Sequence, residues 1–223
     1  MSKTQLQIFF GDKTTAIDPS DIRHKTFQFK NQPTILQHQI HSAQGQQILS
    51  NNKAQPCLSI DGDYLITQEK LLNIAVLTAD CLPIIFYDNK SDACGIAHAG
   101  WRGTTQEIVL KTICHMQQAF DTKINNLSIW FGPAAQICCY EVQENFIQNL
   151  PHPTITSQVL RKEKLQYYFD VSLYNIALLQ SIGIPKEHIN LSHNLCTICN
   201  LKFCSYRRDK GSPIRQISLI GLY

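Results

Sequence analysis

An apolar run near the middle of the chain, "NIAVLTADCLPIIFYD", is interrupted by two ionisable residues, Asp80 and Cys81. The segments on either side are short and rich in β-branched residues, which is typical of buried strands. Pro83 has no N–H group to donate, so it cannot continue the hydrogen bonding of a central strand. The pattern therefore predicts two buried strands, with a carboxylate and a thiol where the first of them ends.

Further short segments, bounded by turn-forming residues, predict more strands. They are "LQIFFG", "TILQHQIHS", "GDYLIT", "ACGIAHAG", "LSIWFGP" and "IRQISLIGL". Helical periodicity predicts helices over residues 104–120, 142–150 and 171–182, the last one capped by Asp170 and ended by Gly183 and Pro185. Strand pairs without strict β-α-β alternation favour a layered α+β sandwich over a doubly wound sheet.

Length and composition predict a single domain over residues 1–223, because 43% hydrophobic and 17% charged residues are ordinary values and no linker-like segment occurs. A net charge of +3 and scattered Lys and Arg residues argue against a nucleic-acid partner. The chain shows neither a secretory signal nor a membrane-length apolar run, so we expect a cytoplasmic protein without a membrane partner. In a reducing compartment, the nine cysteines indicate metal binding or catalysis rather than disulfides.

Three metal-binding side chains fall at the ends of predicted strands. His41 ends "TILQHQIHS", Cys81 follows the interrupted apolar run, and His98 precedes a glycine turn in "ACGIAHAGWRG". Two imidazoles and one thiolate can form a His2Cys zinc site that leaves a fourth position for water or substrate. Asp80, at the kink before Pro83, could reach such a site as a proton acceptor.

The residues alone leave other interpretations open. A single strand-end histidine is more often a hydrogen-bonding residue, and a buried cysteine is usually a small hydrophobic residue. A metal-free alternative has His98 activate Cys81 as a nucleophile. A non-enzymatic interaction module is less favoured, because packing alone does not require polar strand ends such as "ADCLP" and "AHAGWRG".

Five strings that occur in order along the chain resemble the laccase-like family, also called multicopper polyphenol oxidase domains. They are "QIHS", "TADCLP", "GIAHAGWRG", "GPAAQICCYEV" and "CTICNLKFCSYRRD", followed by "LIGL". Members are described as purine nucleoside phosphorylases with added adenosine deaminase and methylthioadenosine phosphorylase activity. The resemblance implies a Zn2+ ion held by His41, Cys81 and His98, with copper as an alternative metal. It also implies an α/β/β/α sandwich similar to the catalytic domain of cytotoxic necrotizing factor.

The chain departs from the family pattern at its start. The segment "FFGDKTTAIDPSDIRHKTF" lacks the family's Arg-Gly-Gly-containing segment, and Ser42 replaces the usual glycine after the first metal-binding histidine. If the absent segment helps to hold the substrate, Lys13 or Arg23 could take its place.

Several side chains are candidates for binding the nucleoside and phosphate. Arg102 opens a predicted helix, where a guanidinium and N–H groups favour an anion such as phosphate. Arg207 and Arg208 are adjacent, so in an extended segment at most one of them faces the site. Tyr206 could stack on a purine. We expect Arg102, Tyr206 and Arg207 to bind substrate, with Asp80 and Cys81 as the catalytic residues of a monomeric enzyme.

The remaining cysteines receive no ligand role. "CTIC", residues 196–199, has Cys204 nearby but no second well-spaced pair, which argues against a zinc ribbon. Cys138 and Cys139 are adjacent and are interpreted as packing residues.

The alternatives to the phosphorylase are a copper-dependent polyphenol oxidoreductase, suggested by the family's older name, and a Cys81–His98 hydrolase acting on cell-wall precursor peptides.

Overall fold

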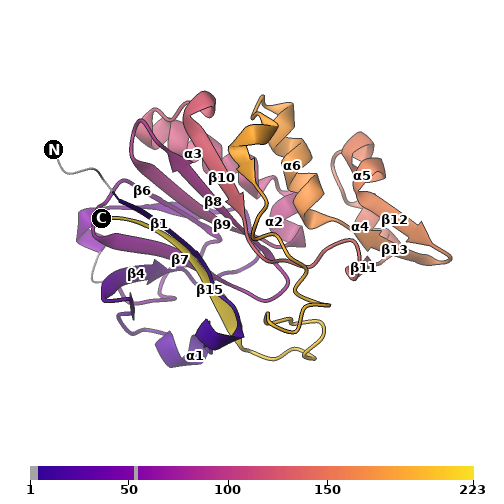
Figure 1. The fold of residues 1–223 in the computed structure, drawn as a ribbon, viewed down its shortest axis with the longest axis horizontal. Helices are drawn as coiled ribbons and strands as arrows, with labels where there is room; N and C mark the ends of the chain where they lie inside the picture. The colour runs from indigo at the N-terminus through magenta and orange to yellow at the C-terminus, as the bar shows by residue number, and fades with distance from the viewer. Residues whose placement is uncertain (1–4, 53–54) are drawn as a thin grey trace.

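Two six-stranded β-sheets pack against each other, and helices cover the outer face of one of them (Figure 1). The computed structural model describes residues 5–52 and 55–223. The strands of sheet I lie in the order β1 (Leu6–Phe10), β15 (Arg215–Leu222), β7 (Leu72–Thr78), β4 (Gln32–Leu36) and β3 (Gln28–Phe29), with β2 (Ala16–Ile17) also pairing with β15. The strands of sheet II lie in the order β14 (Ile189–Asn190), β10 (Leu127–Phe131), β8 (Leu82–Asp88), β9 (Ala93–Ala99), β6 (Tyr64–Thr67) and β5 (Gly45–Ile48).

The helices are concentrated on one side of this sandwich. On sheet II, α3 (Ile108–Phe120) packs against β6 and β9, next to α2 (Trp101–Thr105) and α6 (Val171–Ser181). The outer face of sheet I carries α1 (Pro19–Ile22) and loops rather than a full helical layer. The fold is therefore mixed α and β, as expected, with the predicted fourth layer reduced to one short helix.

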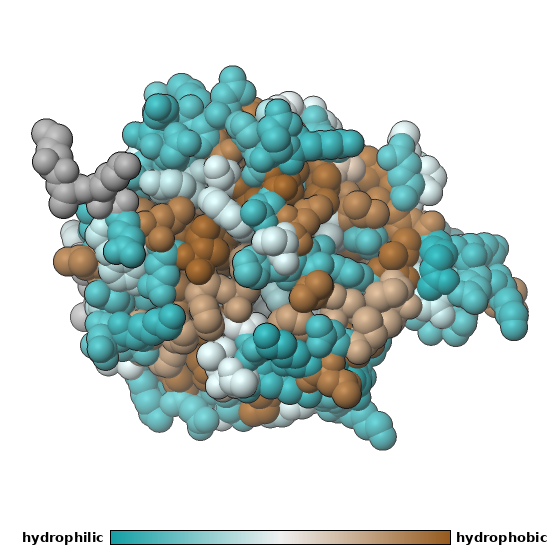
Figure 2. Space-filling model, viewed as in Figure 1, coloured by the Kyte–Doolittle hydropathy of each residue, from teal (hydrophilic) through white to brown (hydrophobic). Residues whose placement is uncertain are grey.

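A small third sheet projects from the sandwich on the right of Figure 1. It consists of β11 (Glu141–Val142), β13 (Gln166–Phe169) and β12 (Leu160–Glu163), and α4 (Glu144–Gln148) and α5 (Pro153–Val159) lie between these strands in sequence. Strands β12 and β13 form a hairpin, called the projecting hairpin here, and Figure 2 shows mainly hydrophilic side chains over it. Short 3-10 helices occupy Lys13–Thr15, Ser50–Asn52, Ile124–Asn126 and Lys186–His188.

Alternation along the strands of sheet II explains why this sheet is apolar on both faces. Leu82, Ile84 and Phe86 of β8 join the core beneath the helices, whereas Ile85 joins the core between the two sheets. Successive side chains of a strand point to opposite faces, so a sheet covered on both sides needs apolar residues at every position. The near-continuous apolar run in the sequence follows from this burial.

The chain passes from one sheet to the other at the interruption of the apolar run. Strand β7 belongs to sheet I and β8 to sheet II, so residues 79–81 form the link between the sheets. Asp80 adopts a left-handed backbone conformation with φ of 80° in this link. Pro83 is the second residue of β8, and its carbonyl accepts a hydrogen bond from Gly132 N at 2.9 Å. The predicted strand ends on either side of Cys81 are confirmed.

Two predicted elements differ in the structure. The strand expected to reach His41 ends at Leu36, and His41 lies in a loop with φ of 59°, so strand alternation does not place its side chain. The helix expected over residues 104–120 is divided into α2 and α3, because Glu107 adopts a left-handed conformation with φ of 60°.

Within the described ranges, no helix has the length and apolar character needed to cross a membrane.

The two remaining helix predictions can be compared residue by residue. The predicted segment 142–150 begins as a strand, because Val142 belongs to β11 and α4 starts at Glu144. The third helix, α6, lies where it was predicted, and the Asp170 carboxylate caps it by accepting from Leu173 N at 2.8 Å.

Replacing Phe86 with alanine tests the packing of sheet II. Phe86 is fully buried in β8, so Phe86→Ala should lower the free energy of unfolding by about 3–5 kcal/mol through lost transfer energy and a cavity. Denaturant unfolding measures the change. Leu165→Ala is the control, because Leu165 is 93% exposed at the tip of the β12–β13 hairpin. Equal effects of the two substitutions would contradict the assignment of β8 to the core.

Candidate metal and substrate site

Three potential metal ligands meet beside the link between the sheets. His41 comes from the loop after β4, Cys81 from the link itself and His98 from the end of β9, and their donor atoms all lie within 4.8 Å of one another. The two imidazole rings meet edge to face, with centroids 4.9 Å apart. A Cβ atom at Gly100 would lie 3.1 Å from Cys81 Sγ and 3.2 Å from His41 Cδ2, so glycine leaves room for this arrangement.

A buried carboxylate, Asp63, orients the His98 ring and holds the backbone of the loop that carries His41. Its Oδ1 accepts hydrogen bonds from His98 Nδ1 at 2.8 Å and from His41 N at 3.0 Å. Its Oδ2 accepts from Ser42 N at 2.6 Å and from Ser42 Oγ at 2.8 Å. Because Nδ1 of His98 is occupied, Nε2 is the nitrogen that remains for a metal, as in many carboxylate–histidine–metal sites.

Electrostatic coupling prepares the thiol for metal binding. Burial alone would raise the pKa of Cys81, but the positive charge of His98 and hydrogen bonds from both histidines outweigh burial and lower it to about 6. Burial alone would lower the pKa of His98, whereas the Cys81 thiolate and Asp63 raise it to about 9. In the metal-free protein near neutral pH, a thiolate therefore faces an imidazolium.

The three side chains fit a zinc ion. Imidazole nitrogen and thiolate sulfur are the ligands that zinc prefers, and three protein ligands leave a fourth position open, as in catalytic zinc sites. All three residues line one cavity of about 650 Å³, called the main cavity here. The open position of a bound ion would therefore be accessible to a small molecule.

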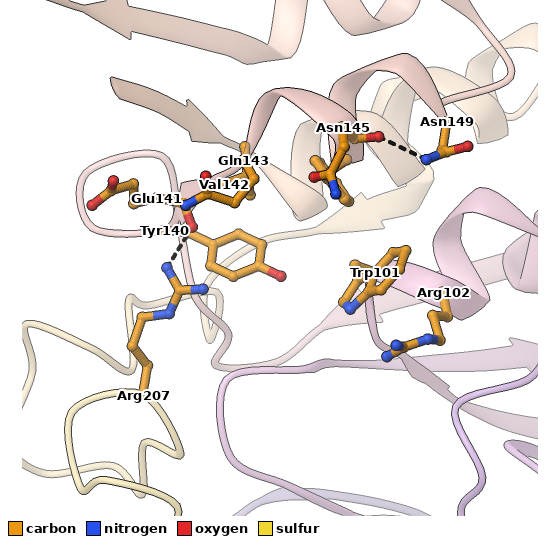
Figure 3. Close-up of a pocket in the computed structure, with 10 residues that line it drawn as sticks. Trp101, Arg102, Tyr140, Glu141, Val142, Gln143, Asn145, Asn149 and Arg207 are labelled. Carbon is orange, nitrogen blue, oxygen red and sulfur yellow. Dashed lines mark hydrogen bonds between the residues drawn. The ribbon is translucent and has the colours of Figure 1, made fainter. Parts of the chain in front are cut away.

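The main cavity combines positive charge with aromatic surface. Its arginines and aromatic residues are Arg23, Arg102, Arg207, Arg215, Trp101, Tyr140 and Tyr206. A second cavity of about 600 Å³ adjoins it and shares Trp101, Arg102, Tyr140 and Arg207 with it (Figure 3). The cavity can thus accept an anionic group and a flat ring near the metal ligands.

Two arginine–aromatic pairs form the wall between the cavities. The Arg102 guanidinium lies over the Trp101 ring at 4.2 Å, and the Arg207 guanidinium lies over the Tyr140 ring at 4.9 Å. Arg207 also donates to the Glu141 carbonyl, and Figure 3 shows the Tyr140 ring between Arg207 and Trp101. Burial raises the pKa of Tyr140 to about 12, with the Cys81 thiolate acting in the same direction, so the phenol stays neutral at pH 7.

The carboxylate of Asp80 anchors a distant loop. Thr197 Oγ1 donates to it at 2.6 Å, Ser205 Oγ at 3.0 Å and Arg207 N at 2.8 Å. These contacts fix the loop that carries Arg207 beside Cys81. The proton-transfer role expected for Asp80 stays a prediction, and its hydrogen bonds make it a positioning residue as well.

The adjacent arginines take different positions. Arg207 lines both cavities, whereas the Arg208 guanidinium donates to the carbonyls of Thr197 at 2.6 Å and Phe203 at 2.7 Å and pairs with Asp209. Arg208 therefore holds the loop together.

The other substrate candidates are also divided. Tyr206 and Arg23 both line the main cavity, and the Tyr206 side chain is half exposed. Lys13 lies 3.9 Å from Asp209 and is not among the residues that line the cavity. Of the two cations that could take the place of the family's N-terminal segment, Arg23 lines the main cavity and Lys13 does not.

Sequence reasoning missed four residues of this site. Asp63 is the second residue of "GDYLIT" and lies directly before β6, and a carboxylate at a strand end is the same signal that singled out Asp80. Trp101 and Tyr140 lie within strings that carried the family resemblance. Gln37 lines the main cavity, and its buried amide has no hydrogen-bond partner among the described residues.

A family model described as multi-copper polyphenol oxidoreductase laccase matches residues 2–223. The chain belongs to this laccase-like family. The expected resemblance is confirmed.

Curated relatives in this family carry the name purine nucleoside phosphorylase. One from Clostridium acetobutylicum is 33% identical over 167 residues, which cover 72% of this chain and 67% of that protein. One from Staphylococcus saprophyticus is 31% identical over 202 residues, covering 86% of this chain and 74% of the relative. The alignment with YlmD of Bacillus subtilis covers 58% of that protein.

Solved structures share the fold. YlmD from Geobacillus stearothermophilus aligns with a TM-score of 0.76 and 30% identity, covering 84% of this chain and 73% of that one. The Bacillus licheniformis protein YfiH aligns with a TM-score of 0.82 and 25% identity, covering 98% of this chain and 93% of that one.

Removing the charge of Asp63 tests its role in orienting the metal ligands. Asp63→Asn should weaken zinc binding about 10–100-fold, the usual effect of losing an outer partner of a ligating histidine. Competition with a chromophoric chelator measures the affinity, and circular dichroism checks the fold. Asp61→Asn is the matched control, since Asp61 pairs with His38 at the surface. Wild-type zinc affinity in Asp63→Asn would contradict the role.

Alkylation of the metal-free protein tests the Cys81–His98 pair. Because thiolate is the reactive form, iodoacetamide should modify Cys81 with a pH midpoint near its pKa of about 6. Peptide mass spectrometry assigns the modified residue, and an excess of zinc should suppress the reaction at Cys81. A midpoint near the ordinary thiol value of 9.0 would contradict the ion pair.

Proposed function

We propose that this chain is a zinc-dependent purine nucleoside phosphorylase that also deaminates adenosine. One observation carries the proposal: His41, Cys81 and His98 share the main cavity with Arg102 and Arg207. The names of the curated relatives support the same substrate class. The substrates would be adenosine, inosine, guanosine or methylthioadenosine, together with phosphate.

The cavity walls suggest how a nucleoside binds. A volume of about 650 Å³ lies within the usual range for small-molecule sites, about 300–1,000 Å³. Trp101, Tyr140 and Tyr206 offer ring surfaces on which a purine can stack, and the neutral Tyr140 phenol can donate a hydrogen bond to it. The nucleoside is thereby held between the metal ligands and the arginine pairs.

The arginines suggest how phosphate binds. Among the described residues, no carboxylate forms an ion pair with the guanidinium of Arg102 or Arg207, so both can bind an anion. A phosphate oxygen would form a bond to C1′ of the ribose while the bond from C1′ to the base breaks. The base leaves with the bonding electrons and takes up a proton. Holding the two reactants in line is the main contribution of these side chains.

The metal site would be formed by Cys81, His41 and Nε2 of His98. A bound zinc ion supplies Lewis acidity and lowers the pKa of a bound water towards about 7, which suits deamination. Asp63 keeps His98 in the required orientation. For Asp80 we propose two roles, as an anchor for the Arg207 loop and as a proton acceptor.

A cysteine hydrolase is the second candidate, because Cys81, His98 and Asp63 form a chain like that of a Cys-His-Asp triad. This candidate keeps its activity when metal is removed, which separates it from the first. The likeness to the catalytic domain of cytotoxic necrotizing factor, which suggested a hydrolase, stays a prediction.

Copper oxidation of phenols fits the site less well. In the described part of the chain, only one of the two groups of metal-binding side chains contains histidine. A laccase needs several coppers, for which three ligands are too few. We retain one copper ion as an alternative metal and propose zinc as the native one.

Product analysis tests the proposed function. Zinc-loaded protein with adenosine and phosphate should release adenine and ribose 1-phosphate, and adenine release should stop when phosphate is omitted. Inosine formed without phosphate would report deamination. Zinc-dependent phosphorolysis of adenosine that survives in Cys81→Ala would contradict the proposal. Amidase activity in the metal-free protein would contradict it as well. Phenol oxidation only after copper loading would favour the oxidoreductase.

Replacing Arg102 tests phosphate binding. Arg102→Ala should raise the apparent KM for phosphate about tenfold or more, since hydrogen bonds to a charged group contribute about 1.5–3 kcal/mol. Arg102→Lys keeps the charge and should recover part of the loss. Steady-state kinetics and zinc content are measured together. Lys162→Ala is the control, because Lys162 lies over Tyr167 in the projecting hairpin. Equal loss of phosphorolysis and deamination in Arg102→Ala would indicate a structural role instead.

A further inference from the structure

A second group of potential metal ligands lies outside the histidine site. The sulfur atoms of Cys138, Cys139, Cys196 and Cys199 all lie within 4.8 Å of one another. All four are free cysteines, with Cys196 buried and Cys138 and Cys199 exposed. The structure therefore brings "CTIC" together with Cys138 and Cys139, which the sequence analysis interpreted as packing residues.

The geometry of the cluster matches a tetrahedral thiolate site. Zinc–sulfur bonds of about 2.3 Å place the sulfurs of a tetrahedral site about 3.8 Å apart. Cys138 Sγ and Cys199 Sγ are 3.9 Å apart. Adjacent cysteines diverge in an extended chain, but Cys138 and Cys139 lie in a tight turn, in which Cys139 N donates to Gln136 O at 2.9 Å. The turn allows both sulfurs to face the same point.

Backbone pairing brings the two cysteine turns together. Ala134 and Cys196 form an isolated parallel bridge, with Ala134 N donating to Leu195 O at 3.1 Å and Thr197 N donating to Ala134 O at 3.0 Å. Each turn follows immediately after this bridge. The fold therefore places the pair Cys138 and Cys139 beside the pair Cys196 and Cys199, with one pair on each of the two bridged segments.

Backbone donor groups in the cluster suit a negative sulfur at Cys196. Backbone N–H groups of Cys199, Gln136 and Ile198 face the Cys196 sulfur, where they stabilise a thiolate. The Arg208 guanidinium binds the carbonyls of Thr197 and Ile198 in one turn.

The second turn also carries a guanidinium. Arg161 Nη2 donates to the carbonyl of Ile137 at 3.3 Å. A cation in the centre and a guanidinium near each turn would reduce the repulsion among four thiolates.

We propose that Cys138, Cys139, Cys196 and Cys199 bind a structural zinc ion, separate from the ion at the histidine site. Four thiolates complete a tetrahedral coordination sphere and leave no open position, so this ion has no catalytic role. On binding, the four thiols lose their protons to solvent. The site does not depend on the proposed enzyme activity.

A zinc ion at the cysteine cluster would also stabilise the wall between the two cavities. The turn with Cys138 and Cys139 precedes Tyr140, and the loop after Cys199 leads to Arg207. These two residues form one arginine–aromatic pair of the wall between the cavities. A zinc ion that joins the two turns therefore fixes both halves of this pair relative to each other.

Metal stoichiometry tests the proposal. Wild-type protein, purified under reducing conditions and analysed by plasma mass spectrometry, should contain two zinc ions per chain. Cys81→Ala and the double variant Cys138→Ser/Cys199→Ser should each contain one. Cys114→Ser is the control, since Cys114 is an exposed cysteine of α3 outside the cluster, and it should retain two.

Cobalt substitution keeps the test decisive if the double variant does not fold. Cys81→Ala loaded with one equivalent of Co2+ should show the intense visible and charge-transfer bands of a tetrathiolate site. Four cysteines that react freely with a thiol reagent in Cys81→Ala after incubation with zinc would overturn the proposal. Iron in place of zinc, or a disulfide among the four cysteines in the reduced preparation, would overturn it as well.

Discussion

The buried carboxylate of Asp63 is the interaction on which the site depends. It is 1% exposed and accepts hydrogen bonds from His98 Nδ1, His41 N and both donor groups of Ser42. A buried carboxylate is unfavourable unless such donors surround it, so its partners are held in fixed positions. Burial raises the pKa of Asp63, but His98 and Ser42 outweigh burial and lower it. Its contribution to stability is therefore present above the unfolded value of 3.8 and is lost as pH falls through the folded pKa.

The link between the two sheets determines where the ligands meet. Because β7 and β8 belong to different sheets, Cys81 lies at the edge where both sheets end. The pKa of His98 is raised to about 9, so in the metal-free protein its charge stabilises the fold fully below the unfolded value of 6.5. That contribution is lost as pH rises through about 9. A bound cation would take over the pairing with the Cys81 thiolate.

The sequence predicted those parts of the structure that depend on local pattern. Strands such as β7, β8 and β9 were visible because burial on both faces leaves continuous apolar runs. The backbone conformations of His41 and Glu107 could not be predicted, because a left-handed backbone in a non-glycine residue has no reliable sequence signal. The cysteine cluster joins turns far apart in the chain, and no periodicity reports such a contact. Cys81 and His98 were found because polar residues at strand ends stand out against an apolar run.

Anomalous diffraction at the zinc absorption edge tests the central claim most directly, namely that Asp63 orients the ligands of a metal site that opens into the main cavity. Crystals of the zinc-loaded protein should show an anomalous peak bonded to Cys81 Sγ, His41 and Nε2 of His98, while Nδ1 of His98 stays bonded to Asp63. The remaining position on the ion should face the cavity that contains Arg102 and Arg207. No peak at these residues, or coordination through Nδ1 of His98, would contradict the account.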